Sequence, residues 1–321
     1  MTQANESRQP VKVGLMMSNL PSGLSPLDMA QVVEDLGFDS CWTGEHFTNW
    51  SPVSSAVVSM AMMAARTQRI TLGSAIILLP LRHPVPLAKD LGTLDILSGG
   101  RLIVGVGVGG ENPREFEACG IPVRERGPRA SEAIQVMKKL WGEKSVDFPG
   151  RFFPLRGATM EPKPVQSGGP PVWVGGRRES AMRRAARYAD GWLPYLYSPE
   201  QYRESVTKIA TYACEAGRDP EAISKGLFIF TCVADSRAEA RATVEARLGR
   251  VYRQDFSTIV ERCCLAGTPE ECVARLREYV DAGARHIILT PCCPAEDVPA
   301  QVQAFATRLA PGVRRLGGKD G

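Results

Sequence analysis

Short apolar segments alternate with longer helical patterns along the chain of 321 residues, and this alternation constrains the fold more than any other feature. Continuous apolar, β-branched character is typical of parallel strands buried on both faces, which need crossover helices between them. An α/β chain with eight such strands predicts a (β/α)8 TIM barrel, a fold that commonly exceeds the usual length of one domain. The eight predicted strands are Val11–Met17, Ser40–Thr43, Thr71–Ile77, Leu102–Val106, Val172–Val174, Gly191–Pro194, Leu227–Ala234 and His286–Leu289.

Capping residues mark the starts of several predicted helices. The segments Ser198-Pro199-Glu200-Gln201 and Thr268-Pro269-Glu270-Glu271 each place a hydroxyl before a proline and an amide or acid three residues later. Ser25 also precedes a proline, and Ser236 is followed three residues later by Glu239. Each capping side chain satisfies an amide that has no partner within its own helix. The helices are therefore indicated independently of the strands.

One Pro/Gly-rich stretch interrupts the alternation between the fourth and fifth predicted strands. It runs from Trp141 to Pro171. We expect a single domain over residues 1–321 with an insertion at about 142–171, holding a small hairpin that folds over the barrel mouth. The alternative is a simple long connection.

Composition narrows the class of protein. Hydrophobic residues make up 44% and charged residues 23%, the balance of a soluble globular protein. A net charge of +4 without a Lys/Arg run gives no case for a nucleic-acid partner. No apolar run approaches the ~20 residues of a membrane span, and Met1–Pro10 lacks the apolar core of a signal peptide. We expect a cytoplasmic protein without a membrane partner.

The cysteines and histidines form no metal-binding pattern. The nine cysteines are irregularly spaced without a C-x-x-C, so reduced and mostly buried thiols are expected. His46, His83 and His286 are far apart in the sequence and lack the spacing of metal ligands. We therefore predict no metal site.

The second strand is followed by the first candidate for chemistry. Active sites of (β/α)8 barrels lie at the C-terminal ends of the strands. There the sequence places Glu45, His46 and Phe47, with Trp50 three residues later. An imidazole at such a place exchanges a proton at neutral pH. The alternative is a structural, hydrogen-bonded histidine.

The fourth strand ends in Gly105-Val106-Gly107-Val108-Gly109-Gly110, which matches the G-x-G-x-x-G dinucleotide fingerprint. We reject that interpretation, because the fingerprint belongs to a first βα unit and this segment lies in the fourth. The glycines instead favour close approach of a planar ring to the backbone. Glu111 follows them, and Asn112 has the character of a helix cap. The alternative for Glu111 is a solvated loop acid.

The fifth strand is followed by Gly175-Gly176-Arg177-Arg178 and then by a predicted helix. Glycine amides, a helix N-terminus and two guanidinium groups together favour an anion, so we predict a phosphate site. The alternative is a turn with a solvated helix face.

At these residues the sequence resembles the bacterial-luciferase-like (luciferase-like monooxygenase) family. The resemblance covers roughly Val11 to Leu309 and is specific for the family rather than for a substrate. It rests on Glu45-His46-Phe47, residues 94–101, the glycines of 105–110, and residues 172–176 with 185–192. Members of the family use flavin mononucleotide (FMN) or the deazaflavin coenzyme F420, and many are dimers.

The resemblance favours the branch of F420-dependent oxidoreductases. In that branch an acid precedes His-Phe, a tryptophan comes three residues later, and a glutamate follows the fourth-strand glycines. Glu45, Trp50 and Glu111 fit these places. Many flavin monooxygenases of the family have Glu-His-His, where this chain has Phe47. The resemblance also implies a bulge with a non-prolyl cis peptide at Ala75–Ile76, behind the ring.

The function that the resemblance implies is hydride transfer between F420 and a small organic substrate. His46 would exchange a proton with the substrate, and Glu45 would orient it or tune it electrostatically. Trp50 would wall the pocket, and Glu111 would protonate the ring nitrogen that gains charge. The expected cofactor-binding residues are Ala75, Ile76, Gly107, Gly109, Gly110, Gly175, Gly176, Arg177 and Arg178.

Two alternatives remain open. One is an FMN-dependent monooxygenase to which a partner reductase supplies reduced flavin. The other is a barrel that binds the cofactor without catalysis. A carrier does not require proton-transfer residues at several strand ends, which counts against the second alternative.

Overall fold

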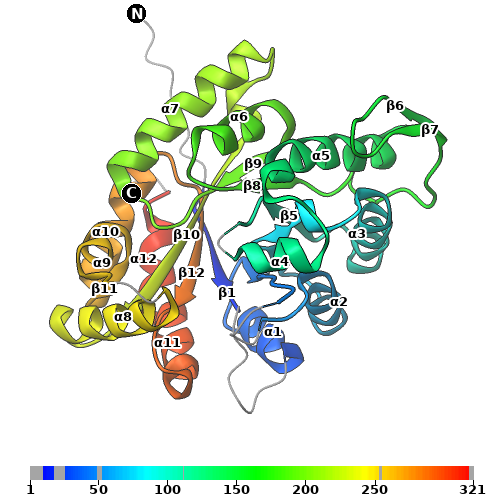
Figure 1. Ribbon diagram of the computed structural model, residues 1–321. Coiled ribbons are helices and arrows are strands. Elements are labelled where there is room, and N and C mark those ends of the chain that lie inside the picture. Colours follow the sequence, from blue (N-terminus) through cyan, green and yellow to red (C-terminus); the bar gives the residue numbers. More distant parts are fainter. Residues whose placement is uncertain (1–9, 18–25, 49–52, 111, 253–254, 318–321) are drawn as a thin grey trace, which may run out of the picture.

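Eight parallel strands close into a barrel within the part of the chain that the structure, a computed structural model, describes: residues 10–17, 26–48, 53–110, 112–252 and 255–317 (Figure 1). Each strand pairs with the next, and β12 pairs with β1 to close the ring. The predicted (β/α)8 fold is confirmed. The barrel strands are β1 (Lys12–Met16), β2 (Ser40–Thr43), β3 (Thr71–Ser74), β5 (Leu102–Gly107), β8 (Val172–Gly175), β9 (Gly191–Leu193), β10 (Ser224–Val233) and β12 (His286–Pro291).

Helices surround the barrel (Figure 1). The predicted capping boxes at Ser198 and Thr268 are both present, at the starts of α7 and α10. The α-helices are α1 (Pro26–Asp35), α2 (Ala56–Arg66), α3 (Pro84–Ser98), α4 (Pro113–Ala118), α5 (Arg126–Gly142), α6 (Glu179–Tyr188), α7 (Pro199–Glu215), α8 (Arg237–Tyr252), α9 (Ser257–Cys263), α10 (Pro269–Asp281), α11 (Val298–Ala304) and α12 (Ala310–Arg315). Short 3₁₀ turns are η1 (Leu79–Leu81), η2 (Val123–Glu125), η3 (Pro220–Ala222) and η4 (Ala295–Asp297), and η5 (Phe305–Leu309) is a π-helical turn.

Apart from shifts of one or two residues at strand ends, the strands differ from the prediction in three places. The third strand breaks at a non-prolyl cis peptide, Ala75–Ile76, as the family resemblance implied, and resumes as β4 (Ile77–Leu78) against β5. The strand β10 begins at Ser224 rather than Leu227, because backbone pairing with β9 extends it through polar residues. A further strand, β11 (Leu265–Gly267), pairs with the end of β10 outside the barrel.

The predicted insertion contains a hairpin, β6 (Val146–Phe148) with β7 (Leu155–Ala158), and it lies on the outer side of α3 and α5 (Figure 1). The carboxylate of Glu132 on α5 accepts hydrogen bonds from the amides of Phe152 and Phe153. Phe153 and Val146 are buried in the core that these helices share. No residue of 142–171 lines the cavity at the barrel mouth. The expectation that the hairpin covers the mouth is wrong, because its apolar side chains bind it to the helices.

Indole rings fill the interior of the barrel. Trp42 and Trp173 are buried with ring centroids 5.6 Å apart, where glycines on neighbouring strands leave room for them. Below them the Ser40 hydroxyl accepts a hydrogen bond from Trp42 Nε1 and lies 2.6 Å from His286 Nε2. Burial lowers the pKa of His286 to about 3, so this histidine is neutral in the folded protein near neutral pH.

This depressed pKa predicts a loss of stability in acid. Between the ordinary histidine pKa of about 6.5 and the folded value of about 3, the unfolded chain binds a proton that the folded chain does not. Stability therefore falls as pH is lowered through that window, by about 1.4 kcal/mol per pH unit for this group. Urea unfolding at several pH values should show a shallower decline for His286→Gln than for the wild type. His83→Gln, at an exposed histidine, is the matched control, and parallel wild-type and His286→Gln profiles would contradict the assignment.

Candidate active site

A cavity of about 1570 Å³ opens at the C-terminal ends of the barrel strands. The candidate residues Trp50 and Glu111 lie outside the described residues. The other candidates all line this cavity, which brings together segments that are far apart in the sequence. They are Glu45, His46, Ala75, Ile76, Gly107, Gly109, Gly110, Gly175, Gly176, Arg177 and Arg178.

The acid paired with His46 is Glu115, from the first turn of α4. Its Oε2 lies 3.0 Å from His46 Nδ1, and its other oxygen accepts from the amide of Phe47 at 2.7 Å. Glu115 is 2% exposed, whereas about one third of the His46 side chain is open to the cavity. Because an ionised carboxylate only accepts hydrogen bonds, it favours a proton on Nδ1 and leaves Nε2 for a ligand.

The start of α4 holds the histidine loop at a second point. Asn112 caps α4 by accepting from the amide of Arg114, and its amide nitrogen donates to the carbonyl of Thr48 at 2.7 Å. With the contacts of Glu115, these bonds fix the backbone that follows His46. Because hydrogen bonds from α4 hold this loop, the imidazole of His46 keeps one orientation, which efficient proton transfer requires.

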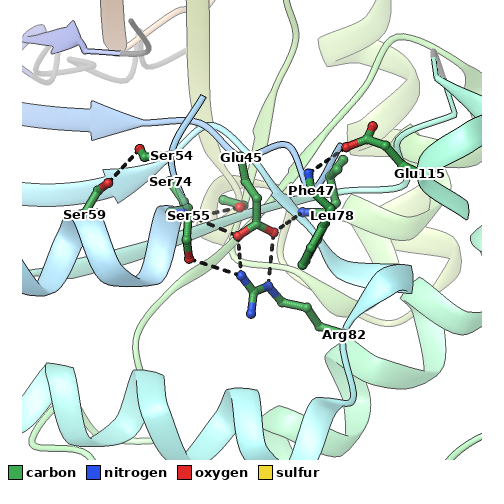
Figure 2. Close-up of polar contacts among 11 residues, drawn as sticks. Glu45, Phe47, Ser54, Ser55, Ser59, Ser74, Leu78, Arg82 and Glu115 are labelled. Atoms are coloured by element: carbon green, nitrogen blue, oxygen red, sulfur yellow. Dashed lines mark hydrogen bonds and ion pairs between the residues drawn. The ribbon is translucent and has the colours of Figure 1, made fainter. Parts of the chain in front are cut away.

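The side chain of Glu45 lies in a buried polar cluster with Arg82 and Leu78 (Figure 2). Its carboxylate accepts from the amides of Ala56 and Leu78 and from Arg82, whose Nε lies 3.0 Å away. The carboxylate that orients His46 by a hydrogen bond belongs to Glu115 rather than to Glu45, and the electrostatic tuning expected of Glu45 stays a prediction. Glu45 instead connects the start of α2, the strand β4 and η1, and so forms a structural support for the site.

Three strand-end glycines leave room for neighbouring groups of the third strand. A Cβ at Gly107 would lie 2.5 Å from Ile76 Cδ1, and one at Gly175 would lie 2.8 Å from Ile76 Cγ2. A Cβ at Gly105 would lie 1.8 Å from the carbonyl oxygen of Ser74. Gly105, Gly107 and Gly175 therefore accommodate the break at Ala75–Ile76, and the close approach of a planar ring to the glycines stays a prediction.

The turn after β8 gathers positive charge at one end of the cavity. Arg177, Arg178 and the first residues of α6 line it, and the start of α6 has no side-chain cap. The guanidinium of Arg177 lies over the ring of Tyr195 at 4.7 Å. The uncapped amides and the guanidinium groups together favour an anion.

Sequence reasoning missed part of this basic end. Arg124, Arg126, Ser131 and Arg184 line the same end of the cavity. Arg184 is 8% exposed and donates to Ser131 Oγ and to the carbonyl of Gly127, and burial lowers its pKa. These residues lie within or beside helices, where only the packing of α5 against α6 brings them to the mouth.

Neither a metal site nor a membrane span is found in the described part of the chain. No group of three or more His, Cys, Asp or Glu residues there could hold a metal ion. No helix among the same residues is long and apolar enough to cross a bilayer. All nine cysteines are free thiols.

A (β/α)8 barrel with a paired imidazole and an arginine-rich turn on one cavity has the layout of barrel enzymes, whose active sites lie at this end. The chain belongs to the luciferase-like monooxygenase family, whose model matches residues 22–286. The family assignment made from the sequence is confirmed.

Individual relatives include enzymes with different cofactors and reactions. An F420-dependent glucose-6-phosphate dehydrogenase from Kineococcus radiotolerans is 28% identical, covering 95% of this chain and 98% of the relative. Among solved structures, the monooxygenase RslO1 from Streptomyces bottropensis is 28% identical, with a TM-score of 0.82 over 94% of this chain and 99% of that chain. An F420-dependent secondary alcohol dehydrogenase, solved with an F420-acetone adduct, has the same fold at 23% identity, with a TM-score of 0.84 over 95% of this chain and 99% of that chain.

Proposed function

We propose that the protein is an oxidoreductase that uses coenzyme F420 for hydride transfer to or from a small organic substrate. The observation that carries the proposal is the shared cavity of the His46–Glu115 pair and the Arg177–Arg178 turn. Relatives that align along nearly their whole length are F420-dependent dehydrogenases, which supports the same cofactor here.

The residues present fit F420 by charge. The tail of this coenzyme carries a phosphate followed by carboxylates, so it is more negative than FMN. The basic end of the cavity has five guanidinium groups, which suit such a polyanion better than a single phosphate. They belong to Arg124, Arg126, Arg177, Arg178 and Arg184.

In this proposal the chain's own residues position the reactants and move a proton. Bound F420 would supply or accept the hydride with its electron pair. Ala75 and Ile76 would support the ring from below, beside Gly107, Gly109 and Gly110. His46 Nε2 would take the proton of a substrate hydroxyl during oxidation, or return it during reduction, with Glu115 stabilising the imidazolium.

Three further assignments belong to the proposal. Trp50 would wall the pocket and Glu111 would protonate the ring nitrogen. Glu45 would act indirectly, by holding together the segments that support the site. Gly175 and Gly176 would bring the turn close to the phosphate, where the uncapped amides at the start of α6 are the donors, since the Gly176 amide donates to the carbonyl of Leu193.

We also propose the setting in which the protein works. Residues 1–321 would act as one domain, assembled as a homodimer in the cytoplasm, where nine free thiols stay reduced. A separate reductase would supply reduced cofactor if the chain consumes it. No nucleic-acid partner is proposed.

The second candidate function is an FMN-dependent monooxygenase, favoured by the likeness to the monooxygenase from Streptomyces bottropensis. It would consume oxygen and yield a hydroxylated or cleaved product. A barrel that binds the cofactor without catalysis is the remaining alternative, and it would show tight binding without turnover.

Cofactor titration tests the choice. Quenching of cofactor fluorescence should give a Kd for F420 about tenfold or more below that for FMN, because extra carboxylates meet the arginines. The double variant Arg177→Ala and Arg178→Ala should weaken F420 binding by about tenfold or more. Arg187→Ala, on α6 but outside the cavity, is the matched control. Tighter binding of FMN, or a double variant that binds like the wild type, would defeat the proposal.

A further inference from the structure

The cavity continues past the proposed cofactor site to the opposite side of the barrel mouth. There it is lined by β10, α8, β12 and α11. We call this part the distal lobe and define it by Phe228, Phe230, Leu248, Val251, Thr290 and Val302. Five of these six side chains are apolar.

Thr290 is the exception within the distal lobe. It is 7% exposed, and its hydroxyl is the one buried side-chain nitrogen or oxygen in the described residues that has no hydrogen-bond partner. Thr290 lines the cavity and pairs in register with Phe230 on β10, as Ile288 pairs with Phe228. Since Ile288 packs with Trp42 and Trp173 inside the barrel, Thr290 lies on the same inward face, one layer nearer the mouth.

A buried hydroxyl without a partner is a feature that proteins seldom keep. Such a group loses its bonds to water and gains none in return, which costs about 1–3 kcal/mol. The hydroxyl itself has almost no exposed surface, but the Thr290 side chain lines the cavity, so a rotation about its Cα–Cβ bond would let a ligand oxygen satisfy the group. The apolar surroundings favour a ligand whose remaining surface is apolar as well.

The same surroundings disfavour a polyhydroxylated ligand. Each sugar hydroxyl buried against Phe228, Phe230 or Leu248 would itself lack a partner. Arg247 on α8 is the one charged residue of α8 that lines the cavity. One guanidinium group cannot satisfy the several hydroxyls of a sugar ring as well.

We propose that the distal lobe binds an apolar alcohol or ketone, with the Thr290 hydroxyl hydrogen-bonded to its oxygen. The binding claim stands by itself, and the claim that such a molecule is the substrate rests on the proposed function. In oxidation the alcohol carbon would lose hydride with its electron pair to oxidised F420. The hydroxyl proton would pass to a protein base as the C=O bond forms.

The binding experiment needs no cofactor. Calorimetric titration of the protein with 2-butanone, 2-hexanone and 2-octanone should show affinity rising by about fourfold for each added methylene. Thr290→Val should weaken binding of 2-octanone by about tenfold, because one hydrogen bond is lost while the shape is kept. Thr290→Ser, which keeps the hydroxyl, should bind within about twofold of the wild type. Thr207→Val, at an exposed threonine on α7, is the control.

Stability separates a binding role from a structural one. Because Thr290→Val removes an unsatisfied hydroxyl, its melting temperature should equal or exceed that of the wild type. A lowered melting temperature would indicate that the hydroxyl is paired within the protein, and it would overturn the proposal. Equal affinity of Thr290→Val and the wild type for 2-octanone would overturn it as well.

Turnover distinguishes failure of the inference from failure of the proposed function. With F420, 2-octanol should be oxidised with a higher kcat/KM than glucose 6-phosphate, and Thr290→Val should lower that value with an unchanged Kd for F420. Turnover of glucose 6-phosphate in preference to 2-octanol would overturn the claim that an apolar alcohol is the substrate, while keeping F420 chemistry. Binding of 2-octanone without any binding of F420 would sink the proposed function and support the inference.

Discussion

His46→Ala is expected to reduce kcat by about 100-fold or more while F420 still binds, because the variant loses proton transfer and keeps the arginine turn. The imidazole is held by Glu115 on one side and faces the cavity on the other. Turnover is followed by the absorbance of the coenzyme, and its Kd by fluorescence quenching. Unchanged turnover would remove His46 from the mechanism.

Glu115→Gln is the matched variant for this prediction. The amide keeps the size of the carboxylate but loses the negative charge that stabilises an imidazolium at His46. We expect a smaller loss in kcat than for His46→Ala, together with a shift of the pH–rate profile. A profile that matches the wild type would show that Glu115 holds the loop and nothing more.

Glu45→Ala should lower the free energy of unfolding by about 3 kcal/mol, since it removes one partner of a largely buried ion pair. The side chain of Glu45 is 1% exposed, while that of Arg82 is 22% exposed, so water relieves only part of the loss. The amides of Ala56 and Leu78 would also lose their acceptor. Urea unfolding followed by circular dichroism measures the change.

Glu45→Gln separates charge from shape in the same cluster. Gln keeps one oxygen as an acceptor, so its loss of stability should be smaller than that of Glu45→Ala. Glu125→Ala, at the half-buried pair with Arg129 on α5, is the control and should cost about 1 kcal/mol or less. A Glu45→Ala variant as stable as this control would contradict the central role of Glu45.

The barrel could be predicted from the sequence because the signals for its strands and for its helix starts are both local. Strands buried on both faces form continuous apolar segments, and boxes such as that at Ser198 mark helix starts. The break at Ala75–Ile76 follows from family resemblance and not from any property of Gly73 or Ser74. The position of the hairpin at 146–158 depends on long-range packing against α3 and α5, which no local pattern reveals.

The candidate site was predictable where residues directly follow strands. His46 and the turn at Arg177 reach the mouth because the chain leaves the barrel at these points. Glu115 and Arg184 lie on helices, where packing alone decides which face reaches the mouth. Glu115 had one readable signal, since it lies three residues after the capping Asn112.

The contacts of Ile76 have a consequence for engineering. Its methyl groups occupy the spaces that Gly107 and Gly175 leave open, so one residue determines how far the cavity extends down toward the barrel. A smaller residue there would deepen the cavity, and a bulkier one would raise the level at which any planar molecule rests. One substitution at Ile76 therefore adjusts the depth of the cavity. It leaves unchanged the His46–Glu115 pair and the charges of Arg177 and Arg178.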